Sequence, residues 1–335
     1  MTHSLRLALL AVLAVLLGAC APKISLYPDY SAPLLEQHIS GQGENKIALV
    51  YVTGPITTNP RKSFGLNSVT RPSVVQETVA QLHKAGSDPS VRALVLIVDS
   101  PGGTVVASDL LYTELMKFRR ITNKPIVVQM LNVAASGGYY LSLAANSIHA
   151  TPSTITGSVG TIFVSPQVYG LMDKLGLGAT VIKSGRYKDI GSPLRPSQKE
   201  ELKALQNMID SMNSRFLKLV KTQRKLDQKA LNAVAEARVL LAGEALELGL
   251  VDAIGYTDSA IAEAKKLAGI TGNARVIAYR RTQYPDDNVY NTATGQWAQD
   301  SFLQNTGVQI NLFPNLPTGF YHLWAPELSP SASQF

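Results

Sequence analysis

The chain has 335 residues, of which 45% are hydrophobic and 16% charged, a composition that is typical of a globular protein and excludes a disordered one. Its net charge of +7 is concentrated between Lys183 and Lys229, where twelve Lys or Arg residues outnumber five Asp or Glu residues. This stretch could lie against anionic lipid headgroups or simply against solvent. No nucleic-acid recognition motif is present, so nucleic acid is not expected as a partner.

The first twenty residues have the form of a secretory signal. Arg6 precedes an uncharged run of 13 residues, Leu7 to Ala19, which is too short for an ordinary transmembrane helix and suits a signal peptide. The run ends in LGAC, which resembles a bacterial lipobox, and Cys20 is the only cysteine. We therefore expect residues 1–19 to be removed and Cys20 to be lipidated. The alternative is a plain secretory signal that happens to end in cysteine.

These features predict a periplasm-facing lipoprotein of the cell envelope, tethered to a membrane by the lipid on Cys20. Ala21 follows the cysteine where an acidic residue would favour the inner membrane, so the prediction leans towards the outer membrane. The single cysteine also excludes an internal disulfide framework.

Strand-like and helix-like blocks alternate after a polar linker. The apolar runs at 46–54, 91–99 and 125–131 are typical of strands buried on both faces, and helical periodicity fills 73–86 and 107–121 between them. This alternation predicts an α/β fold with a mostly parallel sheet and flanking helices.

The second half has shorter signals. Strands are expected at SIHAT (147–151) and TVIKSG (180–185), and a long helix is expected after a capping box formed by Ser197 and Glu200. Helical patterns at 242–249 and 257–269 end the regular part, and the last fifty residues lack periodicity. The predicted organisation is a signal peptide (1–19), a lipidated N-terminus and linker (20–45), one protein domain (46–270) and an extended C-terminal tail (271–335).

One serine stands at a strand-to-helix turn. In NVAASGGYYLSLAAN, Ser136 follows a buried strand and opens an apolar helix-like stretch whose first N–H groups would be free to bind an oxyanion. Gly137 and Gly138 would let a substrate backbone come close. The Gly-x-Ser-x-Gly motif is absent. Ser136 is therefore either a nucleophile or an N-cap followed by two packing glycines.

A second glycine pair follows a neighbouring strand. DSPGG (99–103) comes directly after the strand that ends at Asp99, at the same edge of a parallel sheet as Ser136, where such sheets bind ligands. The N–H of Gly102 or Gly103 could form an oxyanion hole together with the N–H of Gly137. An ordinary type II turn would explain Pro101-Gly102 equally well.

No histidine is a convincing base for Ser136. His3 lies in the signal, His38 in the linker and His322 in the tail, while His83 and His149 fit structural positions. A lysine held out of water can serve instead, provided that its pKa falls by several units from about 10.4. Lys188, in IKSGRYKDIGSP, is the candidate.

Five ordered motifs resemble one family over residues 46–270. SPGG, ASGGYY, TITGSVGTI, KSGRYKDIGSP and ARVLLAGEALELGLVDAIG follow one another as in the bacterial signal peptide peptidases of the SppA type, which are serine–lysine proteases. The resemblance implies that Ser136 is the nucleophile and Lys188 the general base, and that the hydroxyl of Ser158 holds the lysine amine. It implies the ββα spiral of the Clp-protease and crotonase folds, no metal and no cofactor.

The resemblance also implies a homo-oligomeric ring or dome and, as substrates, cleaved signal peptides and other apolar peptides. An acidic neighbour touching the amine would raise the pKa of Lys188, so we predict that Asp189 points away from it, towards Arg186 or Arg195. Three alternatives are an acyl-CoA enzyme of the crotonase type, an inactive membrane-bound scaffold and a protease for one membrane or lipoprotein partner. The lipobox, where many such peptidases have a transmembrane anchor, favours the last of these.

Overall fold

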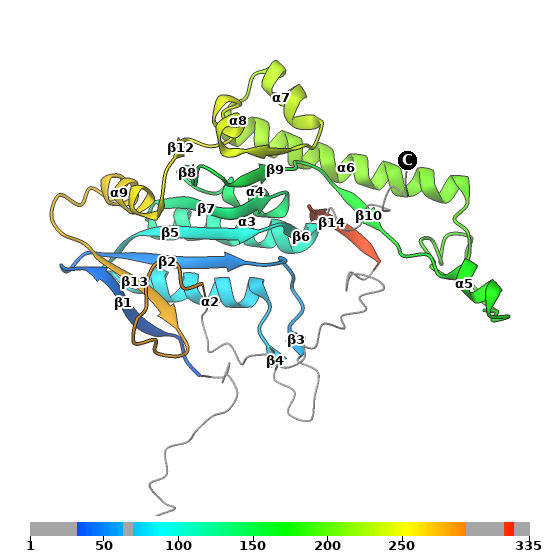
Figure 1. Ribbon diagram of the computed structural model, residues 1–335, viewed down its shortest axis with the longest axis horizontal. Helices are drawn as coiled ribbons and strands as arrows, with labels where there is room; N and C mark the ends of the chain where they lie inside the picture. Colours follow the sequence, from blue (N-terminus) through cyan, green and yellow to red (C-terminus); the bar gives the residue numbers. More distant parts are fainter. Residues whose placement is uncertain (1–31, 63–69, 293–317, 325–335) are drawn as a thin grey trace, which may run out of the picture.

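The computed structural model describes residues 32–62, 70–292 and 318–324 of the chain. A nine-stranded sheet forms its centre (Figure 1). The strands of this sheet are β1 (Leu35–Gly41), β2 (Lys46–Thr53), β5 (Val91–Ser100), β7 (Ile126–Ala135), β8 (Ser147–Ala150), β9 (Ile155–Gly157), β11 (Val239–Leu241), β12 (Ala253–Ile254) and β13 (Arg275–Arg280). Their order is β1-β13-β2-β5-β7-β8-β12, with β9 paired to β7 and β11. Only the pairs β1 with β13 and β11 with β9 are antiparallel.

Burial on both faces explains the apolar sequences of the central strands. Along β2 the side chains of Ala48 and Val50 enter one apolar cluster, while those of Ile47 and Leu49 enter another on the opposite face. Because both faces are covered, the strand is apolar throughout and not alternating. The strands predicted at 46–54, 91–99 and 125–131 are confirmed as β2, β5 and β7, and β7 continues to Ala135, directly before Ser136.

Helices cover both faces of the sheet. They are α2 (Val74–Ser87), α3 (Val105–Thr122), α4 (Gly137–Ser142), α5 (Tyr169–Lys174), α6 (Lys199–Arg224), α7 (Gln228–Ala235), α8 (Ala242–Glu247) and α9 (Thr257–Leu267). Side chains of α2, α3, α4 and α6 belong to the larger apolar cluster, and those of α9 to the cluster on the other face. The predicted α/β class with a mostly parallel sheet and flanking helices is confirmed.

Two local predictions are wrong. Helix α6 is capped by Gln198, whose N–H donates to the Glu201 carboxylate at 2.9 Å, because Glu201 and not Glu200 turns back to the start of the helix. No strand forms at 180–185, since nothing in the described part of the chain pairs with this exposed segment, in which Ile182 is 95% exposed.

A second, three-stranded sheet lies beside the first. Its strands are β6 (Gly102–Thr104), β10 (Ile162–Val164) and β14 (Gly319–Leu323), in the order β10-β14-β6. Elsewhere, β3 (Arg61–Lys62) pairs antiparallel with β4 (Thr70–Arg71). Strand β14 therefore connects the far end of the chain to two segments near Ser136. The domain boundaries at 46 and 270 stay predictions, although β1 and β13 pair with the main sheet from outside them.

Candidate active site

Ser136 occupies the turn between β7 and α4. Its backbone has a φ of 52° and a ψ of −111°, a conformation that residues with a Cβ rarely adopt. The Ser136 N–H donates to the Gly157 carbonyl and its carbonyl accepts from the Tyr140 N–H, both at 2.8 Å. Its side chain makes no capping hydrogen bond, and the residue is 1% exposed. Ser136 thus stands at the N-cap position of α4, but its hydroxyl does not cap the helix, and its role as nucleophile stays a prediction.

The two glycines after Ser136 allow close packing at this turn. A Cβ on Gly137 would collide with the Ser108 hydroxyl, and a Cβ on Gly138 would lie 2.7 Å from the Ser100 carbonyl oxygen. Larger residues would push α4 away from β5 and α3, and would move Ser136 with it.

The glycine turn of β6 lies against the start of α4. Gly102 has a φ of 102°, and a Cβ on it would lie 2.7 Å from the Gly137 nitrogen. The two glycine segments predicted to meet at one sheet edge are thus in contact. Within this structure the Gly102 N–H donates to the Ser100 hydroxyl at 3.1 Å, and that hydroxyl donates to the Gly54 carbonyl at 2.7 Å. The oxyanion roles of Gly102, Gly103 and Gly137 stay predictions.

The segment after β9 forms another wall of the site. The Ser136 hydroxyl donates to the Gly160 carbonyl at 3.5 Å, which is a long contact. Ser158 is half-buried with a φ of 49°, and its N–H donates to the Arg238 carbonyl at 2.8 Å. In the described part of the chain its hydroxyl has no hydrogen-bond partner.

Lys188 makes no hydrogen bond to Ser136 in the part of the chain that the structure describes. It lies in a turn of the exposed segment after α5, where its N–H donates to the Gly185 carbonyl at 3.1 Å. Among residues 32–62, 70–292 and 318–324, neither a hydrogen bond nor an ion pair is made by its amine. The structure therefore brings the glycine segments to Ser136 but does not bring the predicted base to it.

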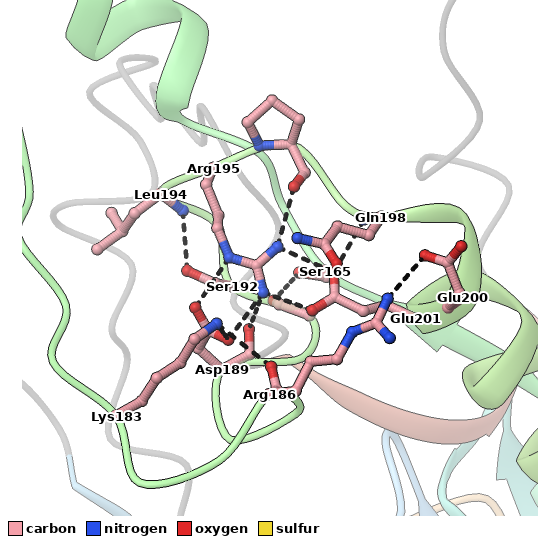
Figure 2. Close-up of polar contacts among 12 residues, drawn as sticks. Ser165, Lys183, Arg186, Asp189, Ser192, Leu194, Arg195, Gln198, Glu200 and Glu201 are labelled. Atoms are coloured by element: carbon pink, nitrogen blue, oxygen red, sulfur yellow. Dashed lines mark hydrogen bonds and ion pairs between the residues drawn. The ribbon is translucent and has the colours of Figure 1, made fainter.

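A network of charged side chains holds the segment around Lys188 (Figure 2). Arg195 donates to both carboxylate oxygens of Asp189, each at 2.8 Å, and also to both oxygens of Glu201, at 2.9 and 2.5 Å. Lys183 adds an ion pair to Asp189 at 2.5 Å. The prediction that Asp189 points to an arginine is confirmed for Arg195, whereas Arg186 pairs with Glu200.

These contacts lower the pKa values of the two carboxylates in the network. Hydrogen bonds from Arg195 and then Lys183 hold the pKa of Asp189 far below its usual range. Arg195 and the Gln198 N–H lower the pKa of Glu201 to about 2. Both carboxylates are therefore charged at any pH at which a peptidase would work, and they tie the loop before α6 to the first turn of that helix.

His322 is the residue that the sequence did not place at the site. Its Nδ1 lies 2.9 Å from the Gly160 carbonyl oxygen and 3.2 Å from the Thr161 hydroxyl, and its ring stacks on Tyr140. Burial lowers the pKa of His322 to about 4. The only signal was local: GFYHL is rich in strand-forming residues, in a region without periodicity.

Several predicted features lie elsewhere. Cys20 and the signal lie outside the described residues. Across the described ranges, no group of three potential His, Cys, Asp or Glu ligands gathers to bind a metal. Every helix of the described part also lacks the length or the apolar content that crossing a bilayer requires.

Comparison with known proteins gives the family. The profile of peptidase family S49 matches residues 119–271. A protein of Methanocaldococcus jannaschii named as a protease is 34% identical over 251 residues, which cover 73% of this chain and 79% of that protein. A protein of Enterococcus faecium named signal peptide peptidase SppA is 38% identical over 61% of this chain and 59% of its own length. Protease 4 of Haemophilus influenzae is 31% identical, and the match covers 78% of this chain but only 41% of Protease 4.

The resemblance to the SppA type is thereby confirmed at the level of the family. The chain belongs to peptidase family S49, and it is a serine peptidase.

Proposed function

We propose that the protein is a membrane-tethered endopeptidase of the cell envelope, with Ser136 as nucleophile and Lys188 as general base. The single observation that carries this proposal is the backbone of Ser136, with a φ of 52° and a ψ of −111° at a strand-to-helix turn. Strain of this kind persists where the surrounding structure enforces it, and it presents the nucleophile in hydrolases that have a nucleophile elbow.

The proposed chemistry combines Lys188 with the groups that lie near Ser136. Neutral Lys188 takes the hydroxyl proton, and the Ser136 oxygen attacks the carbonyl carbon of the peptide bond. The N–H of Gly137, with an N–H of the β6 glycine turn, stabilises the negative charge on the carbonyl oxygen. The lysine returns its proton to the leaving amine. Water, deprotonated by Lys188, then hydrolyses the acyl-enzyme.

The exposed position of Lys188 suggests how this dyad forms. We define the lysine arm as residues 169–198; it projects away from the main sheet (Figure 1). The arm exposes large apolar side chains, among them Leu175 at 63% and Ile182 at 95%. Exposed apolar surface of this kind marks contacts with other chains. We propose a homo-oligomeric ring or dome in which the arm of one copy brings Lys188 to Ser136 of the next.

The substrates proposed are cleaved signal peptides and other apolar peptides. The name of the Enterococcus faecium relative and the apolar residues on the walls of the site, such as Phe163, support this class. The membrane tether is proposed from Cys20, and labelling with a radioactive fatty acid should mark the wild type but not Cys20→Ala. Fractionation of the inner and outer membranes would show where the protein is located. An inner-membrane location favours signal peptides as the substrate, and an outer-membrane location favours a lipoprotein partner.

A complementation experiment tests the dyad and its assembly together. Ser136→Ala and Lys188→Ala should each abolish hydrolysis of an apolar peptide, and Lys188→Ala should also abolish labelling of Ser136 by an acylating probe. Mixing the two inactive variants should restore part of the hydrolysis, because one copy supplies Ser136 and its neighbour Lys188. Lys174→Ala, on the exposed face of the same arm, is the matched control and should stay active.

Two results would contradict parts of this proposal. An active Lys188→Ala variant would remove the lysine from the mechanism. Mixtures that stay inactive, although wild-type and variant chains exchange between oligomers, would place the complete dyad within one chain.

A further inference from the structure

The strongest unexplained feature is β14, which lies between the two walls of the candidate active site. It pairs antiparallel with β6, the glycine turn, and with β10, the strand that follows the Ser158 loop. Tyr321 is opposite Thr104 on one side and Ile162 on the other. An extended peptide substrate recognised by its backbone would add a strand to the same two edges.

The register of β14 puts one peptide bond at the reacting position. His322 is opposite Gly103 and Leu323 is opposite Gly102. The His322 carbonyl oxygen lies so close that a Cβ on Gly102 would collide with it, and a Cβ on Gly137 would lie 3.0 Å from it. These are two of the glycines proposed to bind the oxyanion. The Gly160 carbonyl accepts from the Ser136 hydroxyl and is also in contact with the His322 ring.

The side chains of β14 are packed like those of the core. His322 is 1% exposed, and its ring lies 5.4 Å from the ring of Tyr140 and 4.8 Å from that of Phe216. Phe320 packs on Phe163 with ring centroids 5.0 Å apart. After Leu323, the Trp324 N–H donates to the Pro101 carbonyl at 2.9 Å and continues the pairing past the glycines.

We propose that residues 318–324 act as an inhibitory strand, by which the chain fills its own substrate groove in the orientation and register of a substrate. The inference rests on the proposed function of Ser136. With β14 in place both strand edges are used, and Ser136 is 1% exposed, so an external peptide must first displace the strand.

A role of His322 as the catalytic base does not fit the contacts. Its Nδ1 is engaged by Gly160 and Thr161, and in the described residues no hydrogen bond joins the His322 ring to the Ser136 hydroxyl. The two roles predict opposite results for a variant, since loss of a base stops hydrolysis and loss of an inhibitory strand accelerates it.

The main experiment compares the full chain with a chain that ends before Thr318. The readouts are the rate at which an acylating probe labels Ser136 and the hydrolysis of an apolar peptide. For a segment tethered at an effective concentration of about 1 mM, a free-peptide Kd of about 0.1 mM gives an approximately tenfold faster rate after truncation. The free peptide TGFYHLW should restore inhibition competitively. Equal rates in the two chains would overturn the proposal.

A point variant covers the case in which truncation prevents folding. His322→Asp puts a carboxylate into the apolar pocket beside the Gly160 carbonyl and should release the strand from the full chain, with a similar gain in labelling. Tyr290→Ala, at a 63% exposed position, is the control and should leave the rate unchanged. Loss of hydrolysis in His322→Asp with a folded chain would overturn the proposal in favour of a base. Inhibition that disappears on dilution would overturn it too, because the strand would then come from a second copy.

A binding measurement separates this inference from the proposed function. In a Ser136→Ala background, fluorescently labelled TGFYHLW should bind the truncated chain and not the full chain, whereas a scrambled peptide should bind neither. That result supports the inhibitory role of the strand even if no form of the protein hydrolyses peptides. A lack of hydrolysis would count against the proposed function alone. Equal binding to both chains, or to neither, would overturn the inference.

Discussion

Ser136 and Lys188 are held in two different ways. The Ser136 side is part of the core: its backbone is bonded to Gly157 and Tyr140, and the residue is 1% exposed. Lys188 stands on an exposed turn, and the nearest contacts that fix this turn are the ion pairs of Asp189 with Arg195 and Lys183. Ser136 is positioned by folding itself, and the turn that carries Lys188 by side-chain electrostatics at the surface.

This difference predicts different responses to mutation. Changes on the Ser136 side meet backbone atoms of neighbouring strands, so they should alter the stability of the whole domain. Changes on the Lys188 side meet solvent or flexible side chains, and they should alter activity while leaving the free energy of unfolding unchanged. The assembly proposed above would then act on the lysine arm without disturbing the fold.

The largest effect, on the free energy of unfolding, is expected when two glycines are compared, one from the Ser136 side and one from the Lys188 side. Gly103→Ala would drive a Cβ into the backbone of Ile56, whereas Gly185→Ala, in the lysine arm, meets nothing within 4 Å. We expect Gly103→Ala to lower the free energy of unfolding by about 3 kcal/mol. Gly185→Ala should leave it unchanged or raise it by up to about 1 kcal/mol. Urea denaturation of both variants measures the difference, and similar values for the two would break the comparison.

A smaller effect, on activity, is expected for an arginine pair in the arm. Arg195 bridges Asp189 and Glu201, while Arg186 makes one exposed ion pair with Glu200. Arg195→Ala should lower kcat/KM by about tenfold, because Lys188 loses its orientation. Arg186→Ala should leave kcat/KM unchanged. Arg195→Lys should not rescue the loss, since an ammonium cannot bind two carboxylates in the forked manner of a guanidinium.

The pH range of this network follows from the same contacts. The pKa of Asp189 is lowered well below 3.8, and the pKa of Glu201 is lowered from 4.5 to about 2, so the folded state favours both charged forms. Their contribution to holding the loop before α6 against that helix is complete above the ordinary pKa values, and it is lost as the pH falls through the lowered ones. Hydrogen exchange of residues 183–201 should therefore stay slow down to about pH 4 and rise only in stronger acid. An increase between pH 7 and pH 5 would contradict the arrangement.

The sequence predicted what depends on local pattern. Apolar runs located β2, β5 and β7, and the rule that parallel strands end at one edge brought Gly102 next to Gly137. Charge arguments alone directed Asp189 to an arginine. Periodicity and pairwise electrostatics act over a few residues, so they can be read from the chain.

Pairing between distant segments could not be predicted in the same way. Strand β14 has only five residues and gains its strand form from β6 and β10, more than 150 residues earlier in the chain. His322 was therefore assigned to the extended C-terminal tail. The reverse error occurred at 180–185, where strand-forming residues have no neighbour to pair with among the residues that the structure describes.

The smallest effect tests whether the backbone of Ser136 is strained. Ser136→Ala and Ser136→Gly both remove the hydroxyl and should both be inactive, so their difference isolates the Cβ at a φ of 52° and a ψ of −111°. Glycine adopts this conformation without the steric cost of a Cβ, although it is more flexible in the unfolded chain. We expect the Gly variant to be more stable than the Ala variant by about 1 kcal/mol in urea denaturation. If Ala is as stable as Gly, the turn holds no strain, and the backbone of Ser136 no longer distinguishes a nucleophile from an ordinary buried serine.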